Sequence, residues 1–250
     1  MGEQNLLVHL VRIPYSYLSH RGNRHLGDIA MSGGMVGVIS DYAGRYSWFS
    51  QCLADLVKPE GTKIEWRMGA NRGAMRNALA QACLDQGRDW LFFVDDDQVF
   101  PTGTLMRLLS HEQPVVSALI VQRAAPFLPT AYAGRDADGN YQTLDLRSVG
   151  SNNLVLVAAT GTGGLLVRAD VLRQLGDPWF VYSEAFGEDL FFAGRLAEAG
   201  IPMLVDTGCR MGHVAPAAVF PVPSDDGWLA EFKYSDGTTV SMPLDHTKGE

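Results

Sequence analysis

The sequence has few cysteines and no long apolar run. Cys52, Cys83 and Cys209 are an odd number among 250 residues and lie far apart. That spacing suits neither a disulfide framework nor a paired-cysteine metal site, so we expect reduced side chains. No stretch approaches the roughly 18 consecutive apolar residues of a membrane span, and the first residues lack the basic start and apolar run of a signal peptide. We therefore expect a cytoplasmic protein without a membrane span.

An excess of positive charge is also absent. The 20 Lys and Arg residues against 28 Asp and Glu give a formal net charge of 20 − 28 = −8. A basic groove for the phosphate backbone of nucleic acids is therefore not expected. By contrast, 46% hydrophobic and 19% charged residues are typical of a soluble globular protein with a substantial core. The length suits one large domain or two small ones.

The first half of the chain alternates strand and helix patterns. Short apolar runs typical of buried parallel strands recur at residues 35–40, 62–68, 90–94 and 114–121, with helical spacing of apolar residues between them. This series predicts a sheet of mainly parallel strands covered by helices.

The rest of the chain changes rhythm. The patterns predict antiparallel hairpins at 126–144, a strand at 153–159, a helix at 188–199 and a buried strand at 202–205. From Ala215 onward, four prolines before Leu244 predict a loop-rich closing segment. Near the start, residues 6–13 are a candidate edge strand.

Three adjacent carboxylates, Asp95, Asp96 and Asp97, directly follow the apolar run at residues 90–94. Mutual repulsion and partial burial make such a group costly unless positive charge lies beside it. One interpretation is a hard divalent cation held by oxygen ligands, with Asp95 and Asp97 on one face of an extended turn. The other is a strand-end turn whose acids favour the N-terminus of the helix that begins near Pro101. The spacing leaves both open.

Four segments, in order, resemble a known enzyme family. Residues 76–79, Arg-Asn-Ala-Leu, and residues 90–97, Trp-Leu-Phe-Phe-Val-Asp-Asp-Asp, resemble the donor half of a GT-A glycosyltransferase, in which a DxD triplet ends a central strand. Residues 159–168 resemble the glycine-rich strand of family 2-like members, and residues 187–192 resemble the ED motif that opens their acceptor-side helix. The resemblance extends over about residues 36–214.

The resemblance implies a GT-A fold, which is an α/β architecture with a mixed, mainly parallel twisted sheet flanked by helices. Residues 35–214 would form the glycosyltransferase domain, residues 1–34 an N-terminal extension and residues 215–250 a C-terminal closing segment. The active site is then expected at the carboxyl ends of the strands that end at Ser40 and Val94.

In this family the DxD acids hold Mn²⁺ or Mg²⁺ against the two phosphates of a nucleotide-sugar. The resemblance implies a metal site of Asp95, Asp97 and His213, because several GT-A families add a histidine after the last buried strand. From the residues alone, a lone loop histidine is more often an ordinary hydrogen-bonded side chain. The donor-binding residues that the resemblance implies are Ser40, Asp41, Tyr42, Arg76, Asp95 and Asp96. A salt bridge to nearby acids is the simpler interpretation of Arg76.

The ED motif supplies the predicted catalytic residues, Asp189 and Glu188. In inverting GT-A enzymes, the carboxylate at this motif takes the proton of the acceptor hydroxyl as it attacks the anomeric carbon. We assign this base to Asp189 and expect Glu188 to bind the acceptor or to share the role. Burial beside Phe191 and Phe192 would raise the pKa of the base toward the working pH. The alternative is that both acids stabilise a first helical turn through the helix dipole.

Glycines and aromatic residues near these motifs are the candidate acceptor contacts. Gly163 and Gly164 let a backbone approach a ligand closely, although a strand bulge explains them as well. Trp179 and Trp228 are candidates for acceptor or lid contacts, although most aromatic side chains belong to a core.

The predicted function is metal-dependent transfer of a sugar from a nucleoside-diphosphate sugar to an acceptor hydroxyl, with UDP-sugar and inversion favoured. The acceptor stays open between a sugar, a small molecule, a protein and, as in bacteriophage enzymes of this type, a modified base in DNA. Two other functions also stay open. One is a non-catalytic module that binds nucleotide-sugars or glycans, and the other is a nucleotidyltransferase on a similar scaffold.

Overall fold

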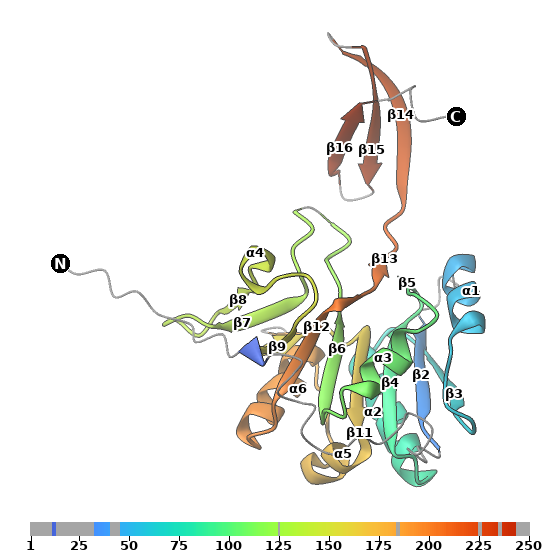
Figure 1. The fold of residues 1–250 in the computed structure, drawn as a ribbon, viewed down its shortest axis with the longest axis vertical. Helices are drawn as coiled ribbons and strands as arrows, with labels where there is room; N and C mark the ends of the chain where they lie inside the picture. Colours follow the sequence, from blue (N-terminus) through green and yellow to red (C-terminus); the bar gives the residue numbers. More distant parts are fainter. Residues whose placement is uncertain are drawn as a thin grey trace, which may run out of the picture.

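A large mixed sheet forms the centre of the fold (Figure 1). The computed structural model describes residues 12–13, 33–40, 46–124, 126–183, 186–224, 227–234 and 237–243. Within these ranges, eight strands join in the order β1-β9-β12-β6-β11-β4-β2-β3. They are β1 (Arg12–Ile13), β2 (Met35–Ser40), β3 (Lys63–Met68), β4 (Trp90–Asp95), β6 (Val115–Leu119), β9 (Leu154–Val157), β11 (Gly164–Arg168) and β12 (Met203–Arg210).

Most of the described strands in this sheet point the same way. β2 is parallel to both β3 and β4, and β6 is parallel to β12. β11 is antiparallel to β4 and β6, and β9 is antiparallel to β12 and β1, so β9 and β11 are the two reversed strands of the described sheet. The predicted fold class, a mixed and mainly parallel sheet flanked by helices, is confirmed.

Alternation along the strands divides the core into two layers. In β4, Leu91 and Phe93 belong to one hydrophobic cluster, whereas Trp90, Phe92 and Val94 belong to the other. Successive side chains of a strand point to opposite faces, so a strand that is apolar at every position is buried on both. Helices α2, α5 and α6 contribute to the first cluster, and α1 and α3 contribute to the second.

The described helices are short, and all but α6 come after a strand in the chain. They are α1 (Ser47–Asp55), α2 (Arg72–Asp85), α3 (Thr104–Ser110), α4 (Leu146–Val149), α5 (Ala169–Leu175) and α6 (Glu188–Glu198). The N-terminus of α2 is capped by Asn71, whose side-chain oxygen accepts the N–H of Ala74 at 2.9 Å. Among the described helices, none is long and apolar enough to cross a membrane.

A small sheet follows the central strands. β7 (Ala131–Arg135) and β8 (Tyr141–Thr143) form an antiparallel hairpin, and β10 (Ala159–Thr160) pairs with β7. This confirms the hairpin predicted within residues 126–144. The strand predicted at residues 153–159 instead divides into β9 of the large sheet and β10 of the small one.

A two-stranded pair connects two distant parts of the chain. β5 (Gln98–Val99) is antiparallel to β13 (Gly212–His213), with Gln98 opposite His213. The residues that follow the acid triplet are thereby fixed beside the chain that leaves β12.

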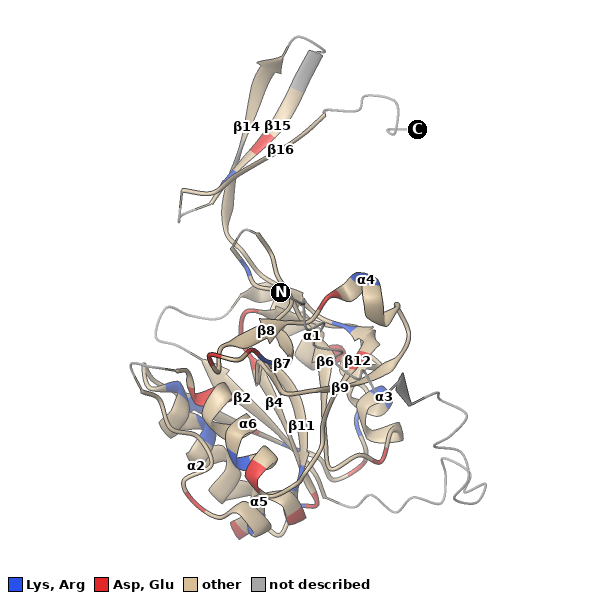
Figure 2. Ribbon diagram, turned by 90° about the vertical axis from the view of Figure 1, so that its left-hand side faces the viewer, with Lys and Arg blue, Asp and Glu red and all other residues tan. Residues whose placement is uncertain are grey.

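The C-terminal strands form a separate sheet that stands away from the body (Figures 1 and 2). It consists of β14 (Ala217–Ser224), β15 (Gly227–Tyr234) and β16 (Thr239–Pro243), paired in antiparallel order. The prediction of a loop-rich segment here is therefore wrong. Pro221 and Pro223 were the misleading signal, because both lie on β14, an edge strand that tolerates a missing backbone N–H.

The N-terminal region contributes a short edge strand. β1 pairs with β9 at the border of the large sheet. Of the edge strand predicted at residues 6–13, only residues 12–13 belong to the described part of the chain. The three cysteines are free thiols, as expected, and Cys83 and Cys209 are buried.

A buried carboxylate, Asp206 on β12, joins β12 to α3. Only 1% of Asp206 is exposed, and its oxygens accept hydrogen bonds from Arg107 Nε at 2.6 Å and Nη2 at 2.9 Å. His111 Nε2 lies 2.7 Å away. Burial raises the pKa of Asp206, but the hydrogen bonds from His111, Arg107 and the Gly208 N–H outweigh it and hold the pKa far below its ordinary value.

This depressed pKa predicts an acid-sensitive contribution to stability. In the unfolded chain the carboxyl titrates near a pKa of about 3.9, so its stabilisation is complete above that pH and is lost as pH falls toward the folded pKa. Urea unfolding is measured at neutral pH and at about pH 3. The free energy of unfolding should fall less between these two pH values in Asp206→Asn than in the wild type. Asp170→Asn, at an exposed acid on α5, is the control. Equal losses in Asp206→Asn and the wild type would contradict the prediction.

Candidate functional site

The acid triplet lies at the carboxyl edge of the large sheet. Asp95 ends β4, and Ser40 ends the neighbouring parallel strand β2, where Ile39 is in register with Asp95. The carboxyl ends of parallel strands meet at one edge of a sheet, which is where α/β folds bind ligands. Asp96 is buried there and accepts a hydrogen bond from Ser40 Oγ at 2.5 Å. Two predicted donor-site residues are therefore in contact.

Asp97 is held by two basic side chains. His213 Nε2 and Arg123 Nη1 each lie 3.1 Å from Asp97 Oδ2. His213 Nδ1 lies 3.1 Å from the Val121 carbonyl oxygen, so this nitrogen donates and Nε2 faces the carboxylate. The β5–β13 pair accounts for the encounter, since it fixes His213 beside the residue that follows Asp97. The sequence prediction placed Asp97 and His213 at one site, and they are in contact.

Asp97 and His213 each stabilise the charged form of the other. Burial raises the pKa of Asp97, but the hydrogen bond and charge of His213, with help from Arg123, outweigh it and hold that pKa below its usual range. For His213, burial lowers the pKa, yet the hydrogen bond and charge of Asp97 outweigh it and leave the pKa raised.

Arg76 lies between the two acidic motifs. Its side chain, only 2% exposed, places Nη2 3.1 Å from the Asp95 carboxylate and Nε 3.4 Å from Glu188 Oε1. Burial lowers the pKa of Arg76, but the charges and hydrogen bonds of both carboxylates outweigh it and raise that pKa. Arg76 thus ties β4 to the start of α6, which is the salt-bridge interpretation of this residue. Its donor contact stays a prediction.

Replacing Arg76 with methionine is expected to lower the free energy of unfolding by about 3 kcal/mol, because the enclosed carboxylates of Asp95 and Glu188 lose their shared cation. Urea denaturation measures the change. Arg72→Met is the matched control, since Arg72 lies one turn earlier on α2 with an exposed side chain. A change below about 0.5 kcal/mol is expected there. An Arg76→Met protein as stable as the wild type would show that the bridge is not structural.

Asp189 has the raised pKa that a proton acceptor needs. It is half-buried in the first turn of α6, and its Oδ1 accepts the Leu190 N–H at 2.8 Å. Burial raises the pKa of Asp189, and the negative charge of Glu188 raises it further. The Leu190 N–H and the charge of Arg76 offset part of this rise. The carboxyl therefore stabilises the start of the helix, and its raised pKa means that it takes up a proton at a higher pH than an ordinary aspartate.

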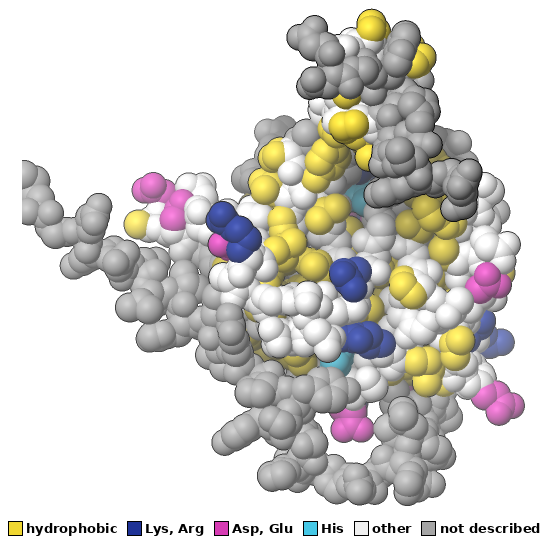
Figure 3. Space-filling view, turned by 45° about the horizontal axis from the view of Figure 1, so that its top comes forward, with side chains coloured by type: hydrophobic (Ala, Val, Ile, Leu, Met, Phe, Trp, Pro, Cys, Tyr) yellow, Lys and Arg dark blue, Asp and Glu magenta, His cyan; other side chains and the backbone are white. Residues whose placement is uncertain are grey.

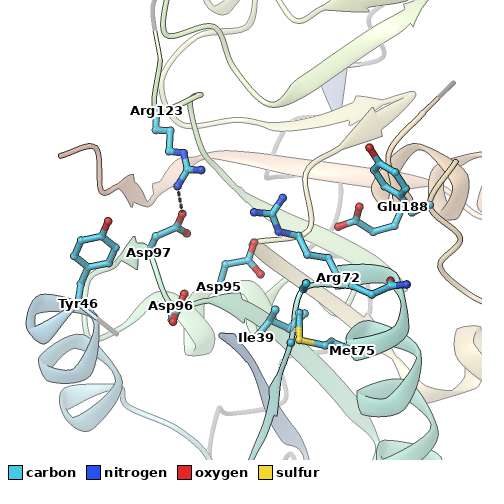
Figure 4. A pocket seen from close by; sticks show the side chains of 13 residues that line it. Ile39, Tyr46, Arg72, Met75, Asp95, Asp96, Asp97, Arg123 and Glu188 are labelled. Atoms are coloured by element: carbon cyan, nitrogen blue, oxygen red, sulfur yellow. Dashed lines mark hydrogen bonds and ion pairs between the residues drawn. The ribbon is translucent and has the colours of Figure 1, made fainter. Parts of the chain in front are cut away.

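Two adjoining cavities bring these groups together. The larger has a volume of about 860 Å³ and is lined by all three acids of the triplet (Figure 4). The smaller, of about 300 Å³, is lined by Gly163, Asp189 and His213 among others. Residues that line both cavities are Arg72, Asp95, Tyr182 and Glu188. One acid of the triplet, Asp95, and one acid at the start of α6, Glu188, therefore border both cavities.

Two arginines of the larger cavity were missed by sequence reasoning. Arg72 is the first residue of α2, and Arg123 follows β6. Figure 4 shows Arg123 above Asp97, whereas the side chain of Arg72 extends from α2 toward Asp95. Figure 3, which views this end of the molecule, shows basic side chains exposed among hydrophobic ones. A usable signal exists for Arg72 only, because a helix that begins after a parallel strand starts at the carboxyl edge of the sheet.

Several predicted residues do not reach the cavities. Trp179 is 2% exposed, belongs to the core and donates its Nε1–H to the Leu172 carbonyl at 2.7 Å, so the structure gives it a packing role instead of an acceptor contact. Gly164 is buried in β11, where a Cβ would lie 2.8 Å from Met211 Sδ, which is a packing constraint. Residues outside the described part of the chain are Asp41, Tyr42 and the side chain of Trp228.

The donor atoms fit a divalent cation with two protein ligands. Among the described residues, no group of three His, Cys, Asp or Glu side chains converges as a metal site. Asp97 and His213 are together, whereas the Asp95 carboxylate pairs with Arg76. A carboxylate and an imidazole suit Mn²⁺, and Mg²⁺ is often bound by one or two carboxylates with phosphate oxygens as further ligands. The pair of Asp97 and His213 thus fits a divalent cation whose other ligands are not among the described side chains.

Comparison with known proteins supports the architecture. No family model matches the sequence, and no curated protein matches it. Protein A197 from STIV superposes with a TM-score of 0.53 at 15% identity, over 85% of this chain and 95% of that one. GalNAc-T7, solved with UDP, GalNAc and Mn²⁺, superposes with a TM-score of 0.50 at 13% identity, over 74% of this chain and 44% of that one.

The chain has the GT-A fold. At these identities the likeness establishes the fold, and the activity has to be argued from the site itself.

Proposed function

We propose that this protein is a metal-dependent glycosyltransferase that moves a sugar from a nucleoside-diphosphate sugar to an acceptor hydroxyl. The observation that carries the proposal is the meeting of the two cavities at Asp95 and Glu188. One cavity is lined by an acid triplet with two arginines, and the other contains an acid of raised pKa. GalNAc-T7, which shares the fold, was solved with UDP and Mn²⁺. A UDP-sugar is therefore the favoured donor.

The larger cavity would bind the donor. Asp97 and His213 would hold Mn²⁺ or Mg²⁺, with Asp95 as the other acid of the DxD motif. When bound, the cation would neutralise the charge that develops on the departing diphosphate. Arg72 and Arg123 both line this cavity next to the triplet and would contact phosphate oxygens. The hydrogen bond from Ser40 Oγ holds the Asp96 carboxylate in one orientation where it lines this cavity.

Asp189 would serve as the general base. The acceptor oxygen attacks the anomeric carbon and forms the new glycosidic bond, while the bond to the diphosphate oxygen breaks and its electron pair leaves with the diphosphate. The proton of the acceptor hydroxyl passes to the Asp189 carboxylate. Attack from the face opposite the leaving group inverts the anomeric configuration. Glu188 is paired with Arg76, so we assign it to positioning Arg76 and the acceptor.

The donor assignment is tested by thermal stabilisation. UDP, GDP and dTDP are added to the protein with and without Mn²⁺, and the unfolding temperature is recorded. One diphosphate, with UDP favoured, is expected to raise Tm only when Mn²⁺ is present. At a ligand concentration of about 100 Kd, the gain in unfolding free energy is about 2.7 kcal/mol. No Mn²⁺-dependent shift with any of the three would overturn the donor assignment.

A further inference from the structure

Gln98 is a buried polar residue beside the acid triplet that the proposed mechanism does not use. It is 2% exposed, lies on β5 opposite His213 and lines the smaller cavity. A side chain with two hydrogen-bonding ends in such a place is expected to have partners for both. Gln98 therefore calls for an explanation beyond packing.

One end of the Gln98 amide has no protein partner. Nε2 donates to Asp97 Oδ1 over 3.4 Å, whereas Oε1 is buried without a hydrogen bond among the described residues. Interchanging the amide oxygen and nitrogen of Gln98 does not give both atoms a partner, because it would place the oxygen next to the Asp97 carboxylate, which cannot donate a hydrogen bond to it. The last torsion of a glutamine side chain is broad, so the amide can turn toward a ligand without leaving a favourable rotamer.

Gly163 lies close to this amide, and both residues line the smaller cavity. A Cβ at Gly163 would lie 3.1 Å from Asp95 Oδ2 and 3.3 Å from Gln98 Nε2. Both distances are shorter than ordinary van der Waals contacts, so a methyl group there would press on both side chains. In the smaller cavity, the amide of Gln98 and the carboxylate of Asp95 thus form a polar recess against the backbone of Gly163.

We propose that the smaller cavity holds the sugar ring of the donor, and that Gln98 accepts a hydrogen bond from one of its hydroxyl groups. The inference rests on the proposed function and adds that this recess binds the sugar ring of the donor. Asp95 lines both cavities, so a donor whose diphosphate lies in the larger one extends into the smaller one past this residue. A volume of about 300 Å³ is at the small end for ligand pockets and suits one ring.

The chemistry of the walls favours a hydroxyl-bearing ligand. Gln98 Oε1 and the carboxylate of Asp95 are hydrogen-bond acceptors, and the hydroxyl groups of a sugar supply the donors. A sugar that lacks the hydroxyl facing Gln98 leaves the amide oxygen unpaired again. Selection against a deoxy sugar follows, because a site built to bind a hydroxyl discriminates strongly against its absence.

Calorimetric titration with Mn²⁺ tests this inference. The dissociation constants of UDP and UDP-glucose, GDP and GDP-mannose, and dTDP and dTDP-glucose are measured, and the ratio within each pair isolates the contribution of the sugar. In Gln98→Leu, the free diphosphate is expected to bind within about twofold of the wild type, while the affinity added by the sugar falls roughly tenfold. A 2-deoxy, 3-deoxy or 4-deoxy analogue of the bound donor should reproduce this loss in the wild type and add none in Gln98→Leu.

Gly163→Ala provides an independent variant, should Gln98→Leu fail to fold. Its methyl group would press on the side chains of Gln98 and Asp95 without removing a polar group. The variant is expected to lose the contribution of the sugar while keeping that of the diphosphate. Retention of the full sugar contribution in both variants would overturn the role of the recess and leave the donor assignment intact. No binding of any diphosphate by the wild type would instead overturn the proposed function, and this inference with it.

Discussion

Replacing Asp97 with alanine is expected to lower kcat/KM for Mn²⁺-dependent donor cleavage by about 100- to 1,000-fold. Asp97 is the acid of the triplet that contacts both His213 and Arg123, so its loss removes the carboxylate ligand of the proposed metal site. Release of the nucleoside diphosphate from a nucleotide-sugar, followed with a coupled assay over a range of Mn²⁺ concentrations, measures the effect. The loss should persist at saturating donor.

Asp89→Ala is the matched control for this variant. Asp89 is an exposed acid that directly precedes β4, whereas Asp97 follows that strand at its other end. Both variants remove one negative charge, so an effect of net charge alone would appear in both. We expect near wild-type activity in Asp89→Ala. Equal activity of Asp97→Ala and Asp89→Ala would contradict a metal role for Asp97.

Replacing Asp189 with asparagine is expected to reduce kcat by about 100- to 10,000-fold, the range that general-base catalysis contributes. The amide is nearly isosteric but cannot take up the acceptor proton. Affinity for the nucleoside diphosphate should change little, because Asp189 lines only the smaller of the two described cavities. Steady-state kinetics combined with titration of the diphosphate separate these two effects. A variant that binds the donor poorly and turns it over normally would contradict the assignment.

The pH dependence of the wild type should carry the signature of Asp189. A base acts in its deprotonated form, and burial beside Glu188 raises the pKa of this carboxyl above its ordinary value. Activity is therefore expected to fall as pH decreases through that raised pKa. In the wild type, kcat/KM should show this acidic limb, and the residual activity of Asp189→Asn should not. An unchanged limb in the variant would assign the titration to another group.

The central architecture could be predicted because local patterns determine it. Residues 90–94 are apolar at every position, which requires burial on both faces of a sheet, and the acids that follow necessarily lie at its carboxyl edge. The C-terminal sheet was missed because prolines are usually evidence against a strand. Whether a strand lies at an edge is decided by its neighbours, and these are not visible in the strand's own sequence.

The partners of the site residues were harder to predict than the residues themselves. Arg123 and Gln98 carry no motif, and each comes to the site through the path of the chain after β6 or through the β5–β13 pair. Trp179 illustrates the opposite error, because an aromatic side chain has the same sequence signature in a core as in a sugar-binding site. Proximity of a residue to a motif along the chain therefore did not decide its role.

Proton NMR of a nucleotide-sugar incubated with the protein, Mn²⁺ and a panel of hydroxyl acceptors is the decisive test of glycosyl transfer. The signal of the donor's anomeric proton should disappear as the nucleoside diphosphate is released. A new anomeric signal of opposite configuration should appear, either from the glycosylated acceptor or from free sugar formed by transfer to water. Asp97→Ala should leave the donor intact. An unchanged donor in the wild type, despite Mn²⁺-dependent binding of the diphosphate, would contradict glycosyl transfer and leave a protein that binds nucleotide-sugars without turnover.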